Sequence, residues 1–358
     1  MLNGASVSST TTNSTGNYSF AGLAAGGTYT VMPVLSSYTF VPTGATFNNL
    51  STSQIASFSG VLNANAPSPT VASVAPTTSA GANQTFVFQF AGSGGSAIAN
   101  VLINTYLDGR QACYLAYVQQ QNMLYLVSNA GDGRYAGAIV LNGSGSLSNG
   151  QCTINVLGSS AVTSGTGLTL TLNLSFASTF GGNKIIYMAA REGINNSGWQ
   201  TMGVHGVPPL PSTLPLPVGM NPPSGSASKT TLSFTFQDAA SASFLQTGWA
   251  LINAAIDGRG ACYIAYYQPG NEIYLFPDNG DGSQANHIAL TGSNTLSNSQ
   301  CTVSAQGSSV IASGSQLTVT LSLSFSSTFT GSKGVWMAVQ SSNGQVSEWQ
   351  GLGQWQMP

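Results

Sequence analysis

Charge is the scarcest property of this 358-residue sequence. It contains seven Lys plus Arg and nine Asp plus Glu, so 4% of the residues are charged, against about a quarter in ordinary soluble proteins. A net charge of −2 provides no basic surface for phosphates, so we expect neither nucleic acid nor anionic lipid as a main partner. Hydrophobic residues still make up 42% of the chain, which is enough to fill folded cores and argues against disorder.

Long apolar runs and histidines are also missing. No apolar stretch reaches the length of about 18 residues that a membrane-spanning helix needs, so we expect no transmembrane segment. The two histidines, His205 and His287, lie outside any recognisable motif, and we interpret both as surface or turn residues. No nucleophile stands in a motif with a base and an orienting group. We therefore do not expect an enzyme.

Cysteine is rare, but its four positions are ordered. The same spacing of 39 positions separates Cys113 from Cys152 and Cys262 from Cys301. Two disulfides explain this pattern and imply an oxidising, extracellular setting. Metal binding is the alternative, although two thiols without paired histidines suit zinc poorly.

The cysteines belong to an internal repeat. The stretch DGRQACYLAY at 108–117 returns as DGRGACYIAY at 257–266, and the offset of 149 positions also relates Phe180 to Phe329. Such self-similarity predicts two equivalent domains.

Alternation of apolar and polar residues predicts strands within each repeat. Residues 168–176 read LTLTLNLSF and residues 317–325 read LTVTLSLSF, which is typical of a half-buried antiparallel strand. Helical periodicity is not convincing anywhere, and Gly-rich and Asn-rich turns recur. We therefore expect an all-β fold with a β-sandwich in each repeat.

The N-terminal residues carry a resemblance to a known family. The segment 12–31 contains Tyr18-Ser-Phe20, then Leu23 and Gly26, then Tyr29-Thr-Val31. It resembles the carboxypeptidase-regulatory-like (transthyretin-like, Ig-type) β-sandwich module of secreted bacterial proteins. The resemblance implies a further strand ahead of residues 2–12, which we expect the chain to lack. An open sheet edge would accept a strand from another chain, and a truncated start is the alternative.

The two repeats resemble uncharacterised modules of large secreted bacterial proteins. We thus expect three β-sandwich, Ig-like domains in tandem in a bacterial protein located outside the cell or on its surface. The predicted units are the N-terminal module 1–62, repeat 1 at 63–208, and repeat 2 at 225–358. Residues 209–224 are rich in proline and predict an extended, semi-rigid connector that separates the repeats.

Charged pairs recur in both repeats and are candidate binding residues. Asp108 with Arg110, and Asp257 with Arg259, could form a receptor-type loop or contact a saccharide. A local turn in which Asp caps backbone amides and Arg pairs with it is the favoured interpretation.

A Gly-bent acidic loop in each repeat is a weak calcium candidate. Asp278 and Asp281 lie in the loop of repeat 2, and Asp132 lies in that of repeat 1. Calcium needs about six to eight oxygen ligands and often a bidentate Glu, so a plain turn is favoured. We expect no other cofactor.

Exposed aromatic residues could stack on sugar rings, although cores use the same residue types. The candidates are Tyr135, Tyr267 and Trp355.

These observations favour an extracellular structural protein that assembles with copies of itself into a filament, sheath or surface layer, with β-strand complementation between subunits as a possible mechanism. The donor strand could be residues 1–12 or the proline-rich connector. The alternative is an adhesin or carbohydrate-binding module of a larger secreted protein, with glycans or a cell surface as partners.

Overall fold

Strands make up most of the chain. The structure, a computed structural model, describes residues 1–35, 38–62, 68–92, 97–141 and 143–357. Within these residues the helical segments are short 3₁₀ turns, and no α-helix occurs. Likewise, the described part of the chain has no helix that is long and apolar enough to cross a membrane. The all-β prediction is confirmed.

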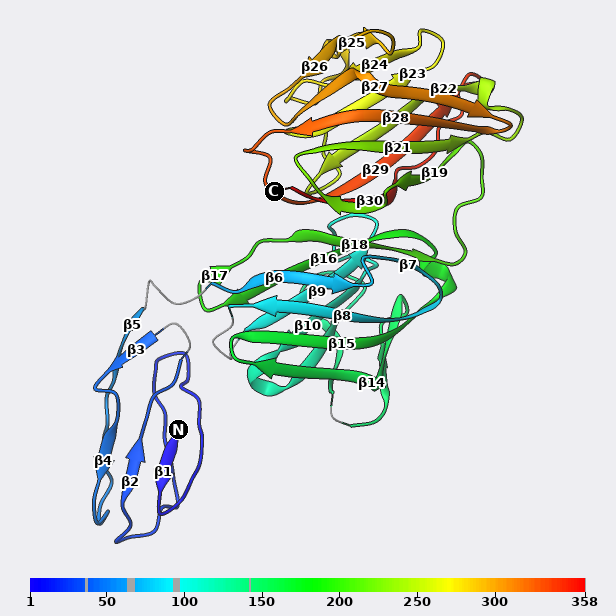
Figure 1. Cartoon of the computed structure of the whole chain (residues 1–358). Helices are drawn as coiled ribbons and strands as arrows, with labels where there is room; N and C mark the ends of the chain where they lie inside the picture. The colour runs from blue at the N-terminus through cyan, green and yellow to red at the C-terminus, as the bar shows by residue number, and fades with distance from the viewer. Residues whose placement is uncertain (36–37, 63–67, 93–96, 142, 358) are drawn as a thin grey trace.

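Repeat 1 consists of two sheets packed face to face (Figure 1). The five-stranded sheet has the order β13 (Ser146–Ser148), β14 (Cys152–Ser164), β15 (Gly167–Phe176), β8 (Asn83–Ala91), β6 (Thr70–Ala75). The larger sheet has the order β12 (Tyr135–Val140), β11 (Met123–Val127), β10 (Cys113–Val118), β9 (Ile98–Asn104), β16 (Gly182–Glu192), β18 (Gln200–Val207), β7 (Thr78–Ala80), with β17 (Asn195–Asn196) beside β16.

Repeat 2 has the same strand order in both of its sheets. One sheet contains β26 (Thr295–Ser297), β27 (Cys301–Ser313), β28 (Gln316–Phe325), β21 (Lys229–Gln237), β19 (Leu216–Asn221). The seven-stranded sheet contains β25 (Asn286–Ala289), β24 (Glu272–Leu275), β23 (Cys262–Tyr267), β22 (Leu245–Asn253), β29 (Gly331–Ser341), β30 (Gln350–Met357), β20 (Ser224–Ser226).

The alternating strands lie at the centre of the five-stranded sheets, as their pattern indicates. In β15, Leu168, Leu170, Leu172, Leu174 and Phe176 are buried, and the residues between them are partly exposed. The apolar face of β15 packs into the core of the sandwich, and its polar face remains accessible to solvent. β28 repeats this arrangement in the core of repeat 2.

The proline-rich connector differs from the prediction. Residues Leu216–Asn221 form β19, which pairs with β21 at the edge of the five-stranded sheet of repeat 2. β19 occupies the place that β6 occupies in repeat 1. The spacer interpretation of residues 209–224 is therefore wrong for its second half, which belongs to the sandwich. An edge strand is the position where a sheet tolerates proline, and Pro217 lies in β19.

The two repeats pack directly against each other through the outward faces of their larger sheets. A cluster of apolar side chains drawn from both repeats fills this contact: Leu102, Ala112, Ile185, Tyr187, Val204, Leu251, Ala261 and Trp336. The contact is reciprocal. Asn183 donates to Gln350 Oε1 over 3.2 Å, and Ser332, which lies 149 positions after Asn183, donates to the carbonyl of Thr201. The repeats are thus related like the two halves of a symmetric dimer.

The N-terminal module is much smaller than the repeats (Figure 1). It has one sheet with the order β1 (Leu2–Gly4), β2 (Tyr29–Val31), β4 (Ala45–Phe47) and a second sheet of β3 (Tyr38–Val41) and β5 (Ser59–Leu62). Among its described side chains, the buried hydrophobic ones are Leu2, Tyr29 and Val31. Its core is correspondingly small.

Candidate functional site

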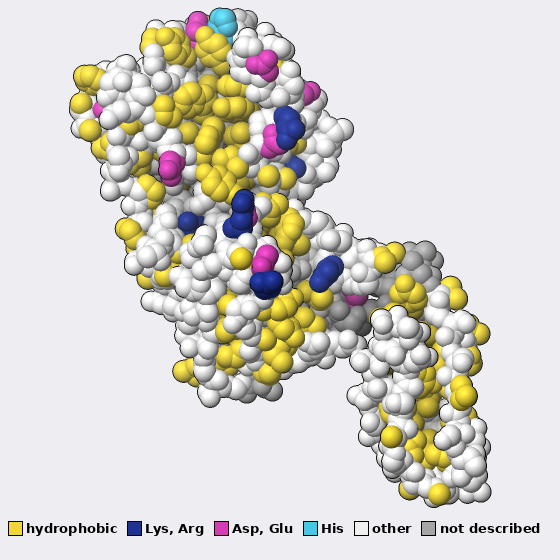
Figure 2. Space-filling view, turned by 180° about the vertical axis from the view of Figure 1, so that it is seen from behind, with side chains coloured by type: hydrophobic (Ala, Val, Ile, Leu, Met, Phe, Trp, Pro, Cys, Tyr) yellow, Lys and Arg dark blue, Asp and Glu magenta, His cyan; other side chains and the backbone are white. Residues whose placement is uncertain are grey.

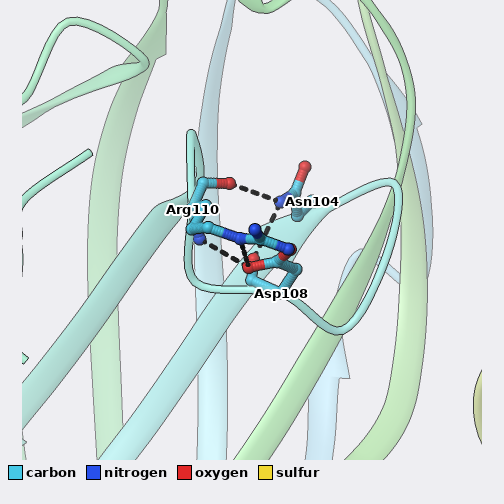
Figure 3. Close-up of polar contacts among 3 residues, drawn as sticks. All are labelled: Asn104, Asp108 and Arg110. Carbon is cyan, nitrogen blue, oxygen red and sulfur yellow. Dashed lines mark hydrogen bonds and ion pairs between the residues drawn. The ribbon is translucent and has the colours of Figure 1, made fainter. Parts of the chain in front are cut away.

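The Asp-Gly-Arg stretch forms a closed turn at the end of β9 (Figure 3). Asp108 accepts a hydrogen bond from the Arg110 backbone N–H at 2.9 Å and contacts its guanidinium through Nη2 at 2.5 Å. Asn104 donates from Nδ2 to the carbonyls of Asp108 and Arg110 over 2.8 and 3.2 Å. The polar groups of the turn therefore bind one another, as the local-turn interpretation predicts.

Repeat 2 contains the same turn with the same contacts. Arg259 donates from its backbone N–H to Asp257 at 2.9 Å and from Nη2 at 2.6 Å, and Asn253 holds the two carbonyls. The hydrogen bond from the Arg259 side chain lowers the pKa of Asp257 to about 2. An Asp that is already paired with a neighbouring Arg has little capacity left to recognise a ligand, so the geometry favours a structural role.

The acidic loops pack against these turns. Gly131 has φ +64° and packs against the backbone of Gly109 and Arg110. A Cβ added to Gly131 would lie 2.7 Å from the backbone nitrogen of Arg110. Gly280 is placed in the same way against Gly258. Only a residue without a Cβ allows the two loops to approach this closely.

The three calcium candidates act as hydrogen-bond acceptors, two of them within these loops. Asp281 accepts from the Ser283 backbone N–H at 3.0 Å, and Asp132 accepts from that of Arg134 at 3.1 Å. Asp278 accepts from the Ser299 N–H at 3.1 Å and lines a cleft of about 170 Å³ beside β26. Within the part of the chain that the structure describes, no group of three or more His, Cys, Asp or Glu residues is placed to hold a metal ion.

Both predicted disulfides are present, and an unpredicted asparagine fastens each of them. Cys113 bonds to Cys152 and Cys262 to Cys301. Asn149, three residues before Cys152, donates to the carbonyls of Ala112 and Val127 over 2.8 and 3.0 Å.

Asn298 makes the equivalent bonds in repeat 2. The signal that could have revealed both residues is the shared sequence Leu-Ser-Asn-x-Gln-Cys at 147–152 and 296–301. Each asparagine ties the ends of two strands to the disulfide loop, so these residues are structural.

The histidine prediction is wrong for His205. This side chain is 1% exposed and lies in the core of repeat 1, where Nε2 contacts the Gly81 carbonyl at 2.9 Å. In repeat 2 Trp355 takes the same place, and its Nε1 donates to the carbonyl of Ala227 at 3.0 Å. Trp355 is itself 3% exposed, so it is unavailable as a sugar-stacking residue.

The other sugar-contact candidates lie on the outward faces of the larger sheets. Tyr135 is exposed in repeat 1 and packs on Tyr125 with ring centroids 4.7 Å apart. Tyr267 is partly exposed in repeat 2 and meets Tyr274 edge to face at 6.4 Å.

More aromatic side chains of repeat 2 lie on this outward face: Trp249, Tyr263, Phe276, His287 and Trp349. The view from behind shows hydrophobic side chains gathered over repeat 2 and continuing toward repeat 1 (Figure 2). Sequence reasoning missed this grouping because it depends on the register of neighbouring strands, β22 to β25.

No protein-family model matches the chain, and no curated protein matches it significantly. The functional argument therefore rests on the geometry described above.

Proposed function

We propose that this protein is an extracellular structural subunit that assembles with copies of itself, and that its N-terminal module accepts a β-strand from a neighbouring copy. The observation that carries the proposal is the sparse core of that module. Three hydrophobic side chains are buried among its described residues. A three-stranded and a two-stranded sheet of three to four residues per strand are at the lower limit of independent stability.

The module offers both features that strand addition needs. β4 pairs with β2 on one side only among the described strands, so its other edge presents free backbone groups. Aromatic side chains stand partly uncovered nearby: Tyr18, Phe20, Phe47 and Phe58. An added strand would pair with the backbone and cover the rings, which combines the two contributions that make strand addition specific.

The remainder of the chain suits a structural role outside the cell. Each repeat carries an internal disulfide, which is typical of proteins in oxidising compartments. Because the surface carries few charges, electrostatic repulsion between copies is weak and does little to oppose association. The resemblance of the N-terminal residues to carboxypeptidase-regulatory-like modules supports the same setting.

Electron microscopy and light scattering of the full chain over a range of concentrations test this proposal. We expect concentration-dependent filaments or oligomers. Thr46→Lys places a charge in the middle of the open edge strand β4 and should abolish assembly. Ser51→Lys, at an exposed position outside the strands, is the matched control and should assemble normally. A monomer at every concentration would contradict the proposal.

A further inference from the structure

The outward face of the seven-stranded sheet in repeat 2 carries two parallel rows of side chains. Strand registers across β29, β22, β23, β24 and β25 define both rows. One row is aromatic, with small residues between the rings: Ala338, Trp249, Ala265, Tyr274 and His287. The adjacent row is largely polar: Gln340, Thr247, Tyr267, Glu272 and Ala289.

The carboxylate of Glu272 lies beside the rings of Tyr274 and His287 and remains accessible to solvent. Tyr274 donates from its hydroxyl to Glu272 Oε2 over 2.9 Å. His287 stacks on Tyr274 at 4.8 Å, and its Nε2 lies 3.8 Å from Glu272 Oε1. The side chains of Glu272 and His287 are 27% and 53% exposed, so a ligand on this face can reach both.

Repeat 1 shows that the fold does not require these side chains. The same registers in its larger sheet give one row of Ala189, Asn100, Ala116, Tyr125 and Ala138 and another of Arg191, Ile98, Val118, Met123 and Val140. Of the three rings in the aromatic row, only that of Tyr274 has an equivalent in repeat 1, at Tyr125. A sandwich with identical strand order thus forms without the tryptophan, the carboxylate and the histidine.

The chemistry of the face selects among possible ligands. Glu272 on the face and a net charge of −2 disfavour nucleic acids and other polyanions. A purely hydrocarbon partner would bury the polar row without hydrogen-bond partners, which is costly. A sugar chain meets both rows, because its C–H faces are apolar and its edges carry hydroxyl groups.

We propose that this face of repeat 2 binds an extended, neutral polysaccharide. Trp249 and Tyr274 contact the apolar sugar faces, while Glu272 accepts hydrogen bonds from the hydroxyls and Thr247 exchanges them. Trp249 and Tyr274 are two strands apart, which is about 10 Å and corresponds to about two sugar units of an extended chain. The rings are therefore spaced to contact alternate sugars.

The test is affinity electrophoresis of the full chain in gels containing hydroxyethylcellulose, xyloglucan or galactomannan. A four-substitution variant that carries the repeat 1 residues, Trp249→Asn, Tyr267→Val, Glu272→Met and His287→Ala, removes the contacts proposed for Trp249 and Glu272 and uses side chains that this fold already accommodates. We expect retardation of the unmodified chain by at least one of these polymers and a loss of affinity of about tenfold or more in the variant.

Matched controls separate binding from folding. Glu272→Gln keeps the side-chain shape and should weaken binding less than the four substitutions together. Tyr125→Ala removes the shared ring from repeat 1 and should leave binding unchanged. Circular dichroism checks that each variant is folded. The proposal is overturned if no neutral polymer retards the unmodified chain, or if the four-substitution variant binds as well as the unmodified chain. It is also overturned if heparin binds more tightly than the neutral polymers.

A second copy is the competing occupant of this face. If light scattering shows dimers of the unmodified chain but not of the four-substitution variant, and no polymer binds, the face is an interface between copies. Because Thr46→Lys acts on the N-terminal module, its effect on assembly is independent of these outcomes.

Discussion

One buried imidazole gives repeat 1 a titratable group in its core. The His205 ring lies between Phe86 and Phe176, with ring centroids 5.4 and 4.9 Å away. Its Nε2 faces the Gly81 carbonyl, which can only accept, so Nε2 carries the proton and Nδ1 accepts from the Ser79 hydroxyl at 2.8 Å. Burial lowers the pKa of His205 below 6.5, and the bond to Gly81 offsets this only in part.

The lowered pKa predicts a loss of stability in acid. Below pH 6.5, the ordinary value, the unfolded chain takes up a proton that the folded chain does not, so the free energy of unfolding falls as the pH drops from 6.5 toward the folded-state pKa. We expect the unfolding midpoint of the coupled repeats in urea to decrease between pH 7 and pH 5. His205→Gln should flatten this dependence.

His287→Gln is the control for this prediction, because His287 is exposed. If the two glutamine variants show the same pH dependence as the unmodified chain, the acid response does not originate at His205.

A shared irregularity distinguishes the long strands β14 and β27. The pairing of β14 with β15 shifts between Asn155 and Ser160, and Gly158 has φ +87° there. Ser159 bridges the gap: its hydroxyl donates to the Asn155 carbonyl at 2.6 Å and accepts from the Asn173 N–H at 2.9 Å. Ser308 makes the same two bonds in β27. The side chain thus replaces backbone pairing that the bulge interrupts.

We expect Ser159→Ala to destabilise repeat 1 by about 1–3 kcal/mol, since it leaves a donor and an acceptor without a partner in a largely buried position. Ser160→Ala, at the adjacent exposed position, should change stability by less than about 0.5 kcal/mol. Equal effects of the two substitutions in urea unfolding would mean that the bridging hydroxyl is unimportant.

Among the individual strands, the sequence predicts some well and others poorly. β15 and β28 are predicted because strict alternation reflects one buried face. β19 is missed because the prolines in and before it indicate a spacer, and only the sheet edge beside β21 explains how Pro217 fits a strand. The aromatic row of repeat 2 depends on register across five strands, which no local pattern encodes.

The contact between the repeats is also absent from the predictions. Residues Val101, Leu102 and Ile103 are consecutive and all buried, because one face of β9 packs into the sandwich core and the other against repeat 2. A continuous apolar run is typical of a strand covered on both faces. The repeat pattern indicated two separate modules, whereas the packing joins them into one body.

Trp336 is the largest fully buried side chain in the contact between the two repeats. It is fully buried within the cluster shared by the two repeats, and its Nε1 donates to the Thr105 carbonyl at 3.4 Å. Trp336→Ala should cost about 3–5 kcal/mol and uncouple the repeats, so that calorimetry resolves two transitions where the unmodified chain shows one. Met337→Ala truncates the next side chain, which points into the core of repeat 2, and should lower stability without separating the transitions. If both variants unfold in a single transition, the outward-face contact does not couple the repeats.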